Sequence, residues 1–361
     1  MKKLLSINTI FAFLLLLVSS CDSAGPWADY EPPQIYKPVI YSVAPAESVQ
    51  GSTVTITGFN FKDVISVMIG STEATEYTLD SIASKITVTV PVNAAVGAQP
   101  IALTNGDGTT VASFTVLKKP VPVDVTLKVM SFGISNSKAN LEEVEALIRK
   151  YNPDLVALRE IDSYNTRTDP AIDQGKVIAD KLGMNYLFAS GWPYRGGEYG
   201  PSLLSRFPIK EKFGPTLLPG ATTRPLGYAT VEVVEGFDLM FVAVQMEDGS
   251  ATNRNRDQPL QAQRLLEILG TTQLPVIMGG NFYFDSQTAP HMQTLYSQFT
   301  PGCLGCTLTF PANAPAFVVD HIMFREGLGV KMEVVSYTVG SEEDVLNNKK
   351  PVISEIRITR K

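Results

Sequence analysis

The chain has 361 residues, of which 44% are hydrophobic and 18% charged, so it has a globular composition and room for more than one domain. Its formal net charge of -6 argues against binding nucleic acid through a generally positive surface, although it does not exclude a local basic groove. Only two histidines are present, His291 and His321, which limits any chemistry that depends on imidazole.

Residues 1–20 have the pattern of a secretory signal peptide. Two lysines precede an apolar run at 10–18, which is too short to cross a bilayer comfortably. Residues 17–21 resemble the lipobox of bacterial lipoproteins, which implies cleavage before Cys21 and lipidation of its thiol. The alternative is an ordinary signal peptide with an incidental cysteine. We predict an outer-membrane lipoprotein of a Gram-negative bacterium, at the cell surface or periplasmic face, with residues 21–37 as a tether.

Residues 38–117 alternate apolar and polar side chains with a period of two, and turn residues separate the runs. Strands are expected at 53–57, 65–69, 86–90, 100–103 and 113–116, with a hairpin turn at 105–108. This pattern predicts a small β-sandwich. The runs at 40–45, 51–61 and 67–70 resemble the TIG (IPT) family of immunoglobulin-like domains. The resemblance implies either a spacer or a binding module.

A linker with two prolines, residues 118–124, leads into a region of mixed helix and strand patterns at 125–361. A helix at 140–150, with Asn140 as its N-cap, is predicted between buried strands at 127–135 and 155–158. Helices at 173–182 and 258–269 each end at a glycine. Further strands are expected at 203–209, 229–233, 239–244, 274–278, 317–324 and 351–358. This order predicts an α/β sandwich of two packed sheets flanked by helices.

Cys303 and Cys306 are separated by two residues. In an exported chain this spacing predicts a small-loop disulfide. A metal site would need further ligands, and the sequence offers no second Cys/His pair. A redox-active pair would need a thioredoxin-like context, which the surrounding sequence lacks.

Residues 125–358 resemble the endonuclease/exonuclease/phosphatase family, which has a DNase I-like fold and includes metal-dependent nucleases, sphingomyelinases and inositol phosphatases. The segments that carry the resemblance are 128–132, 153–160, 199–209, 241–242, 275–280, 319–322 and 351–352. The resemblance implies hydrolysis of a phosphodiester or phosphomonoester assisted by a divalent cation, usually Mg²⁺, which Glu160 would hold.

Most residues that this chemistry needs are replaced. Glu160 and Asp320 remain at family-equivalent positions, and Arg224 is a further candidate. The substituted positions are Gly133 for asparagine, Gln245 for histidine, Asn281 and Tyr283 for an Asp-x-Asn pair, and Asn348 and Lys349 for a final Asp-His pair. An amide cannot carry the charge of an imidazolium or a carboxylate, and a lysine is a poor base unless it is strongly desolvated. We therefore predict a pseudoenzyme that needs no cofactor.

The opposing hypothesis is a metal-dependent phosphodiesterase or nuclease with a rearranged site and Mg²⁺ as its cofactor. In that case Glu247, Asp248 or Asp285 would replace a missing carboxylate. Glu160 itself is then either a residual metal or ligand-binding residue, or a buried acid paired with a neighbour.

A degraded hydrolase that keeps its cleft can serve as a binding protein. The glycine-rich run at 192–199 is typical of a loop that presents contacts, and aromatic faces stack on sugar rings. The candidate ligand-binding residues are Trp192, Tyr194, Arg195, Tyr199, Arg224 and Tyr283. Alternatively, these aromatic residues only cover the edge of the core. We predict a surface protein that captures a polysaccharide rather than nucleic acid, with an envelope protein-interaction module as a third hypothesis.

Overall fold

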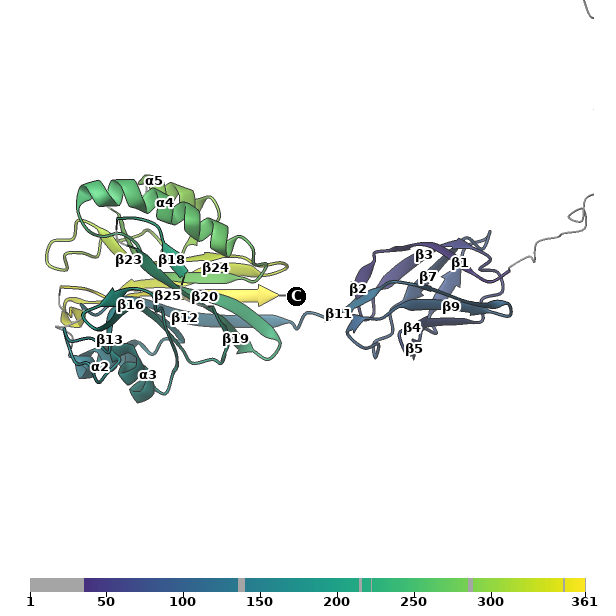
Figure 1. Ribbon diagram of the computed structural model, residues 1–361, viewed down its shortest axis with the longest axis horizontal. Helices are drawn as coiled ribbons and strands as arrows, with labels where there is room; N and C mark the ends of the chain where they lie inside the picture. Colours follow the sequence, from purple (N-terminus) through teal and green to yellow (C-terminus); the bar gives the residue numbers. More distant parts are fainter. Residues whose placement is uncertain are drawn as a thin grey trace, which may run out of the picture. The chain divides into compact units, whose positions relative to one another are not determined.

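The computed structural model describes residues 36–135, 140–213, 216–221, 223–284, 288–346 and 348–360. The predicted signal peptide, Cys21 and nearly all of the tether lie outside these residues. The chain divides into two compact units, Met1–Lys119 and Pro120–Lys361 (Figure 1). Within the described ranges, no helix is both long and apolar enough to span a membrane.

The first unit is built of short strands in three small sheets. Their orders are β1-β3-β7-β6, β10-β9-β4-β5 and β2-β11-β8. The strands are β1 (Val39–Ala44), β2 (Glu47–Val49), β3 (Thr53–Phe59), β4 (Ser66–Ile69), β5 (Thr72–Glu73), β6 (Tyr77–Leu79), β7 (Lys85–Thr89), β8 (Gly97–Ala98), β9 (Ile101–Asn105), β10 (Gly108–Ala112) and β11 (Thr115–Leu117). Val54 and Ile56 of β3 alternate with more exposed neighbours and enter the core, so the period-two pattern reports burial correctly.

The second unit contains two larger sheets. One has the order β14-β16-β13-β12-β25-β24, with β15 beside β16. Its strands are β12 (Val123–Gly133), β13 (Leu155–Ser163), β14 (Asn185–Phe188), β15 (Pro193–Tyr194), β16 (Gly197–Ser205), β24 (Lys331–Val339) and β25 (Val352–Arg360). The other has the order β17-β19-β20-β21-β23-β22, with β18 beside β19. Its strands are β17 (Ile209–Lys212), β18 (Thr216–Leu218), β19 (Arg224–Val234), β20 (Phe237–Gln245), β21 (Val276–Phe284), β22 (Thr300–Pro301) and β23 (Val318–Arg325).

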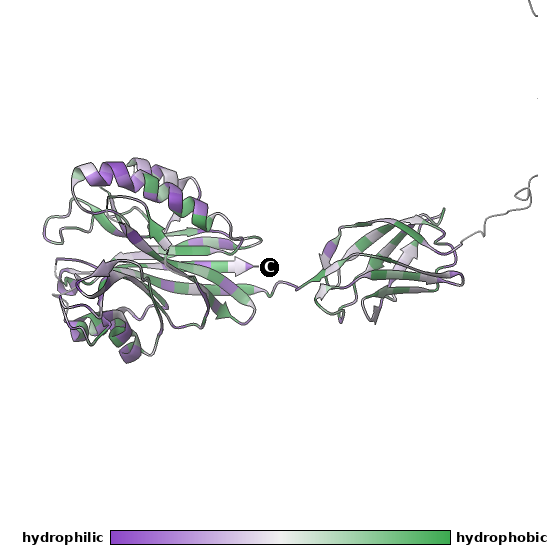
Figure 2. Ribbon diagram, in the orientation of Figure 1, coloured by the Kyte–Doolittle hydropathy of each residue, from purple (hydrophilic) through white to green (hydrophobic). Residues whose placement is uncertain are grey.

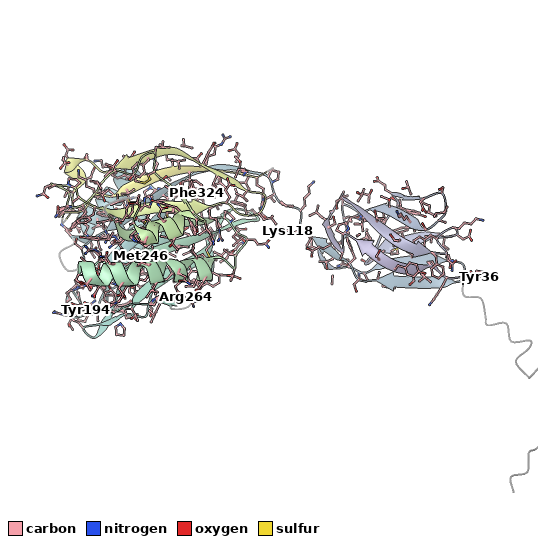
Figure 3. The ribbon with its side chains drawn as sticks, turned by 90° about the horizontal axis from the view of Figure 1, so that it is seen from above. Tyr36, Lys118, Tyr194, Met246, Arg264 and Phe324 are labelled. Atoms are coloured by element: carbon pink, nitrogen blue, oxygen red, sulfur yellow. A yellow bond between two sulfur atoms is a disulfide. The ribbon has the colours of Figure 1, made fainter. Side chains whose placement is uncertain are left out.

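The two sheets pack face to face, and helices cover their outer faces (Figure 1). Apolar side chains from both sheets, including Leu155, Phe241 and Phe324, form the central core. Phe324 is labelled among the strands in Figure 3, and Arg264 marks the solvent side of an outer helix. This arrangement confirms the predicted DNase I-like α/β sandwich.

Helices α2 (Leu141–Tyr151) and α3 (Gln174–Leu182) pack against the first of these sheets, and α4 (Ala251–Leu269) and α5 (Pro290–Tyr296) against the second. A short 3₁₀ turn follows at Glu342–Asp344. The side chain of Asn140 accepts a bond from the Glu142 N–H and caps α2, as the sequence predicts. Gly183 ends α3 with a φ of 67°, a left-handed conformation that glycine adopts without strain.

Helix α4 begins seven residues earlier than the apolar pattern predicts, at Ala251 instead of Gln258. Ser250 caps it, and its first two turns are polar and largely exposed. Hydrophilic residues run along α4 in Figure 2, above hydrophobic strands. Periodicity marks a helix only where one face is buried, so the polar first turns left no such signal.

Candidate functional site

The site begins with an irregularity in β13. The pairing of β13 with β16 is in register up to Leu158 and resumes at Ile161, and Glu160 has a φ of 62°. In a regular strand, Arg159 and Glu160 would point to opposite faces of the sheet. The bulge redirects them, so both side chains are buried and in contact with each other.

Arg159 connects the two sheets. Its Nε donates to Asp320 Oδ1 at 3.0 Å, and its Nη2 donates to Asp320 Oδ2 at 2.5 Å. Ser131 on β12 donates its hydroxyl to the same carboxylate at 2.9 Å. The guanidinium also donates to Glu160, and Arg159 is only 1% exposed. The result is a buried bidentate ion pair in which each charge depends on the others for compensation.

Lys349 supplies a second cation from the segment before β25. Its Nζ lies 2.5 Å from Glu160 Oε1 and 5.2 Å from the centre of the Phe310 ring. Burial alone would raise the pKa of Glu160, but the positive charges of Arg159 and Lys349 lower it to about 2. Burial, reinforced by the charge of Arg159, lowers the pKa of Lys349. Lys349 is thus desolvated, but its ammonium is already bound to Glu160.

These residues do not fit a divalent cation beside Glu160. A Cβ added at Gly133, where the resemblance expects asparagine, would lie 2.6 Å from the guanidinium carbon of Arg159. Arg159 therefore fills the space of that side chain and covers both oxygens of Asp320. A metal ion here would meet two fixed positive charges. We assign no catalytic step to a metal at this position.

The carboxylates proposed as replacements are also paired. Arg224 Nη2 lies 3.2 Å from Glu247 Oε2 and 2.8 Å from Asp248 Oδ1. Asn281 donates its side-chain N–H to Asp248 Oδ2 at 3.2 Å. The third candidate, Asp285, lies outside the described residues. Neither Glu247 nor Asp248 therefore offers a free carboxylate to a metal.

Two of the substituted positions lie side by side. Gln245 on β20 is in register with Asn281 on β21, which in turn faces Asp320 on β23. Both amide side chains are buried, and the oxygens Gln245 Oε1 and Asn281 Oδ1 accept no hydrogen bond from the described protein. They keep hydrogen-bonding capacity at this end of the sheet but bring no charge to it.

Four of the candidate ligand-binding residues come together around the β15–β16 hairpin. The Trp192 ring lies 4.9 Å from that of Tyr199, and the Arg224 guanidinium lies 4.6 Å from Trp192. A further arginine, Arg167, lies 4.4 Å from the Tyr194 ring and 4.7 Å from the Tyr199 ring. Tyr194 lies at the edge of the unit in Figure 3. Cation–π contacts with the protein's own arginines therefore already engage these rings.

Arg195 belongs to the same hairpin, with its guanidinium 5.7 Å from the Tyr194 ring, whereas Tyr283 lies elsewhere. Arg195 is exposed in the turn of the hairpin, with a φ of 47°. The Tyr283 ring lies 4.8 Å from the Phe317 ring at a tilt of 35°, and the Arg254 guanidinium lies 4.4 Å from the Tyr283 ring. Tyr283, Phe317 and Arg254 line a cavity of about 360 Å³. The other residues that line it are Asn255, Gln258, Pro259, Phe284, Thr288, Ala289, Pro290 and His291.

Sequence reasoning missed Arg159, Arg167 and Arg254. Arg159 left a signal, because an arginine next to an acid at the end of an apolar strand must find partners when it is buried. Arg254 left none, because it lies in the polar first turns of α4.

The family comparisons agree with the two-domain organisation and the fold. Residues 130–341 match the model of the Endonuclease/Exonuclease/phosphatase family, and residues 38–116 match the IPT/TIG domain. The chain therefore belongs to the endonuclease/exonuclease/phosphatase family and carries an IPT/TIG domain before the family domain. No curated protein sequence matches it.

Solved structures share the fold of the second unit. An endonuclease/exonuclease/phosphatase from Beutenbergia cavernae DSM 12333 is 19% identical, with 64% of this chain and 71% of that chain covered and a TM-score of 0.51. D. rerio TDP2 complexed with single strand DNA product is 14% identical, with 64% and 99% covered and a TM-score of 0.50. At such identities the similarity concerns the fold alone.

Arg159→Leu should destabilise the second unit by about 3 kcal/mol, because it leaves the buried carboxylates of Glu160 and Asp320 uncompensated. Urea unfolding followed by Trp192 fluorescence measures this. Arg264→Leu, on the exposed side of α4, is the matched control and should cost less than about 0.5 kcal/mol. Adding Asp320→Asn to Arg159→Leu should recover part of the loss. Equal stability of Arg159→Leu and wild type would contradict the assigned network.

The acid stability of the second unit should depend on Glu160. Its pKa falls from 4.5 to about 2 on folding, so the ionised form stabilises the fold above about pH 4.5, and this contribution disappears as the pH falls towards 2. Glu160→Gln should therefore flatten the decline in unfolding free energy across that interval. Glu267→Gln, on the exposed part of α4, should leave the decline unchanged. If the unfolding free energy of wild type and of Glu160→Gln declined in parallel as the pH falls, Glu160 would not be the origin of the acid sensitivity.

Proposed function

We propose that this chain is a non-catalytic member of its family, exported and lipid-anchored at Cys21, that binds a glycan. The observation that carries the proposal is the position of Arg159 and Lys349, whose positive groups both contact Glu160. In place of an exchangeable divalent cation, this end of the fold has two covalently attached cations. They stabilise the carboxylates, but they leave no open coordination position for a phosphate oxygen or a water molecule.

The alternative enzyme would need a carboxylate able to leave its present partner. Glu160 contacts two cations, Asp320 makes a bidentate pair with Arg159, and Glu247 and Asp248 share Arg224. Removing one member of a buried ion pair costs several kcal/mol. This cost favours the pseudoenzyme over a rearranged phosphodiesterase.

The cavity beside Tyr283 supports the glycan part of the proposal. Its volume of about 360 Å³ lies within the range of small-molecule sites. Tyr283 and Phe317 supply apolar ring surface, while Arg254 and Asn255 supply hydrogen-bond donors. Sugars present both apolar C–H faces and hydroxyl groups, so this lining is suited to them. Arg254 also donates to the Gly249 carbonyl and lies against Tyr283, so the wall is largely preorganised.

The location follows from the first residues of the sequence. A lipid on Cys21 would hold the protein at the outer membrane, and the IPT/TIG domain would separate the anchor from the glycan-binding unit. A polysaccharide at the cell surface or in the periplasm is the ligand expected from this order of segments.

The full-length protein should not hydrolyse bis(4-nitrophenyl) phosphate above background with Mg²⁺, Mn²⁺ or Ca²⁺, because no metal site forms beside Glu160. The measurement compares wild type with Glu160→Gln at matched concentration. Equal, background-level rates are expected. Metal-dependent turnover that Glu160→Gln abolishes would overturn the pseudoenzyme assignment.

Binding to a glycan array should depend on Tyr283. Tyr283→Ala should weaken the affinity for a bound glycan about tenfold, which corresponds to losing ~1.4 kcal/mol of aromatic contact. Trp192→Ala is the matched variant at the other aromatic group and should leave binding unchanged. If Trp192→Ala abolished glycan binding and Tyr283→Ala did not, the binding site would have to be assigned to the β15–β16 hairpin instead. Absence of glycan binding, with an envelope protein co-purifying instead, would replace this proposal with a protein-interaction module.

A further inference from the structure

The second unit contains a cluster that the pseudoenzyme assignment does not explain. Cys303 and Cys306 follow β22, and His321 lies on β23; their ligand atoms are all within 4.8 Å of one another. In the structure a disulfide joins the two cysteines. Within the described ranges, these residues are the only group of three His, Cys, Asp or Glu side chains close enough to share an ion.

The fold brings the third residue to the pair. β22 pairs with β23, and the Gly302 N–H donates to the Ile322 carbonyl at 2.8 Å. The Ser354 hydroxyl holds the Gly302 carbonyl at 2.7 Å from the other side. These bonds fix the start of the Cys303–Cys306 loop beside His321. The sequence alone did not show a third ligand, because fifteen residues separate Cys306 from His321.

His321 is oriented as a metal-binding histidine would be. Its Nδ1 faces Cys306 Sγ at 4.0 Å, and its Nε2 lies 3.3 Å from the Tyr296 hydroxyl. In such sites one ring nitrogen binds the metal while the other holds a hydrogen bond that fixes the tautomer. The ring is wholly buried among Phe282, Phe284 and Tyr296, and burial lowers its pKa to about 3, so the imidazole is neutral.

We propose that Cys303 and Cys306, when reduced, bind a thiophilic divalent cation of the Zn²⁺ class together with His321. Two thiolates and one imidazole are ligands that zinc prefers, and they leave a fourth tetrahedral position for water. Both cysteines are only partly buried, so an ion and a reductant can reach them from solvent, whereas His321 contributes from the protein interior.

The conversion of the disulfide into the metal-binding dithiol balances in electrons and protons. A dithiol donor supplies two electrons and two protons, so the disulfide becomes two thiols and the donor becomes a disulfide. The cation then displaces the two thiol protons, and the lone pair on His321 Nδ1 completes the third bond. Disulfide and metal site exclude each other, because both use the same two sulfur atoms.

Bound metal would act on the neighbouring ion network through the backbone. His321 directly follows Asp320, whose side chain holds Arg159 from the other sheet. The cation would tie the exposed loop to the strand that carries this carboxylate. This role is structural and independent of the proposed glycan binding.

Co²⁺ provides the test, because tetrahedral thiolate coordination gives it characteristic visible and charge-transfer absorption. The full-length protein, reduced by a phosphine and kept without oxygen, should bind one Co²⁺ per chain and release it to Zn²⁺. The oxidised protein should show no such spectrum. Cys303→Ser and Cys306→Ser should each weaken binding at least about tenfold, and Tyr296→Phe by about tenfold through its hydrogen bond to His321.

The control variant is His291→Gln, which changes the other histidine and should keep the full Co²⁺ spectrum. A thiolate–cobalt spectrum that survives the Cys303→Ser/Cys306→Ser double change would arise elsewhere in the protein and would overturn the proposal. The proposal would also be overturned if the reduced, folded wild type showed no thiolate–cobalt band. Circular dichroism confirms that each variant is folded.

Discussion

The arrangement of charges in the second unit depends on a single buried guanidinium, that of Arg159. Arg159 pairs with Asp320 across the space between the two sheets and with Glu160 beside it, and Lys349 adds a second cation to Glu160. Burying these four charges is tolerable only because each has a partner of opposite sign. The same pairing places a positive side chain against each of these two carboxylates, at the position where the family resemblance would place a metal. The stability of this end of the fold and the proposed absence of catalysis therefore have one physical basis.

The fold was predictable because its signals are local. The helix α2 follows from four apolar positions and the cap at Asn140, and α3 follows from the helical pattern at 173–182 and its end at Gly183. The strands of the first unit follow from period-two alternation. The early turns of α4 escaped prediction because they bury little apolar surface, so no periodic pattern marks them.

The site was predictable only in part. The family resemblance predicts from the sequence that the uncharged side chains of Gln245 and Asn281 stand where a histidine and an aspartate are expected. It does not show that Arg159 and Glu160 face the same way, because that depends on a bulge in β13. Nor does it show that Lys349 reaches Glu160 across 189 residues, or that Tyr283 lies apart from Trp192. These are tertiary facts that no local pattern encodes.

The contact between Arg159 and Gly133 also constrains how this domain can change. A Cβ at position 133 would lie 2.6 Å from the guanidinium carbon, so a side chain there would require Arg159 to move away from its carboxylate partners. Replacing Arg159 first would leave the buried carboxylates of Glu160 and Asp320 without this partner. Each of these two changes is therefore unfavourable alone. Positions 133 and 159 are therefore coupled, and substitutions at the two should be tolerated best when they occur together.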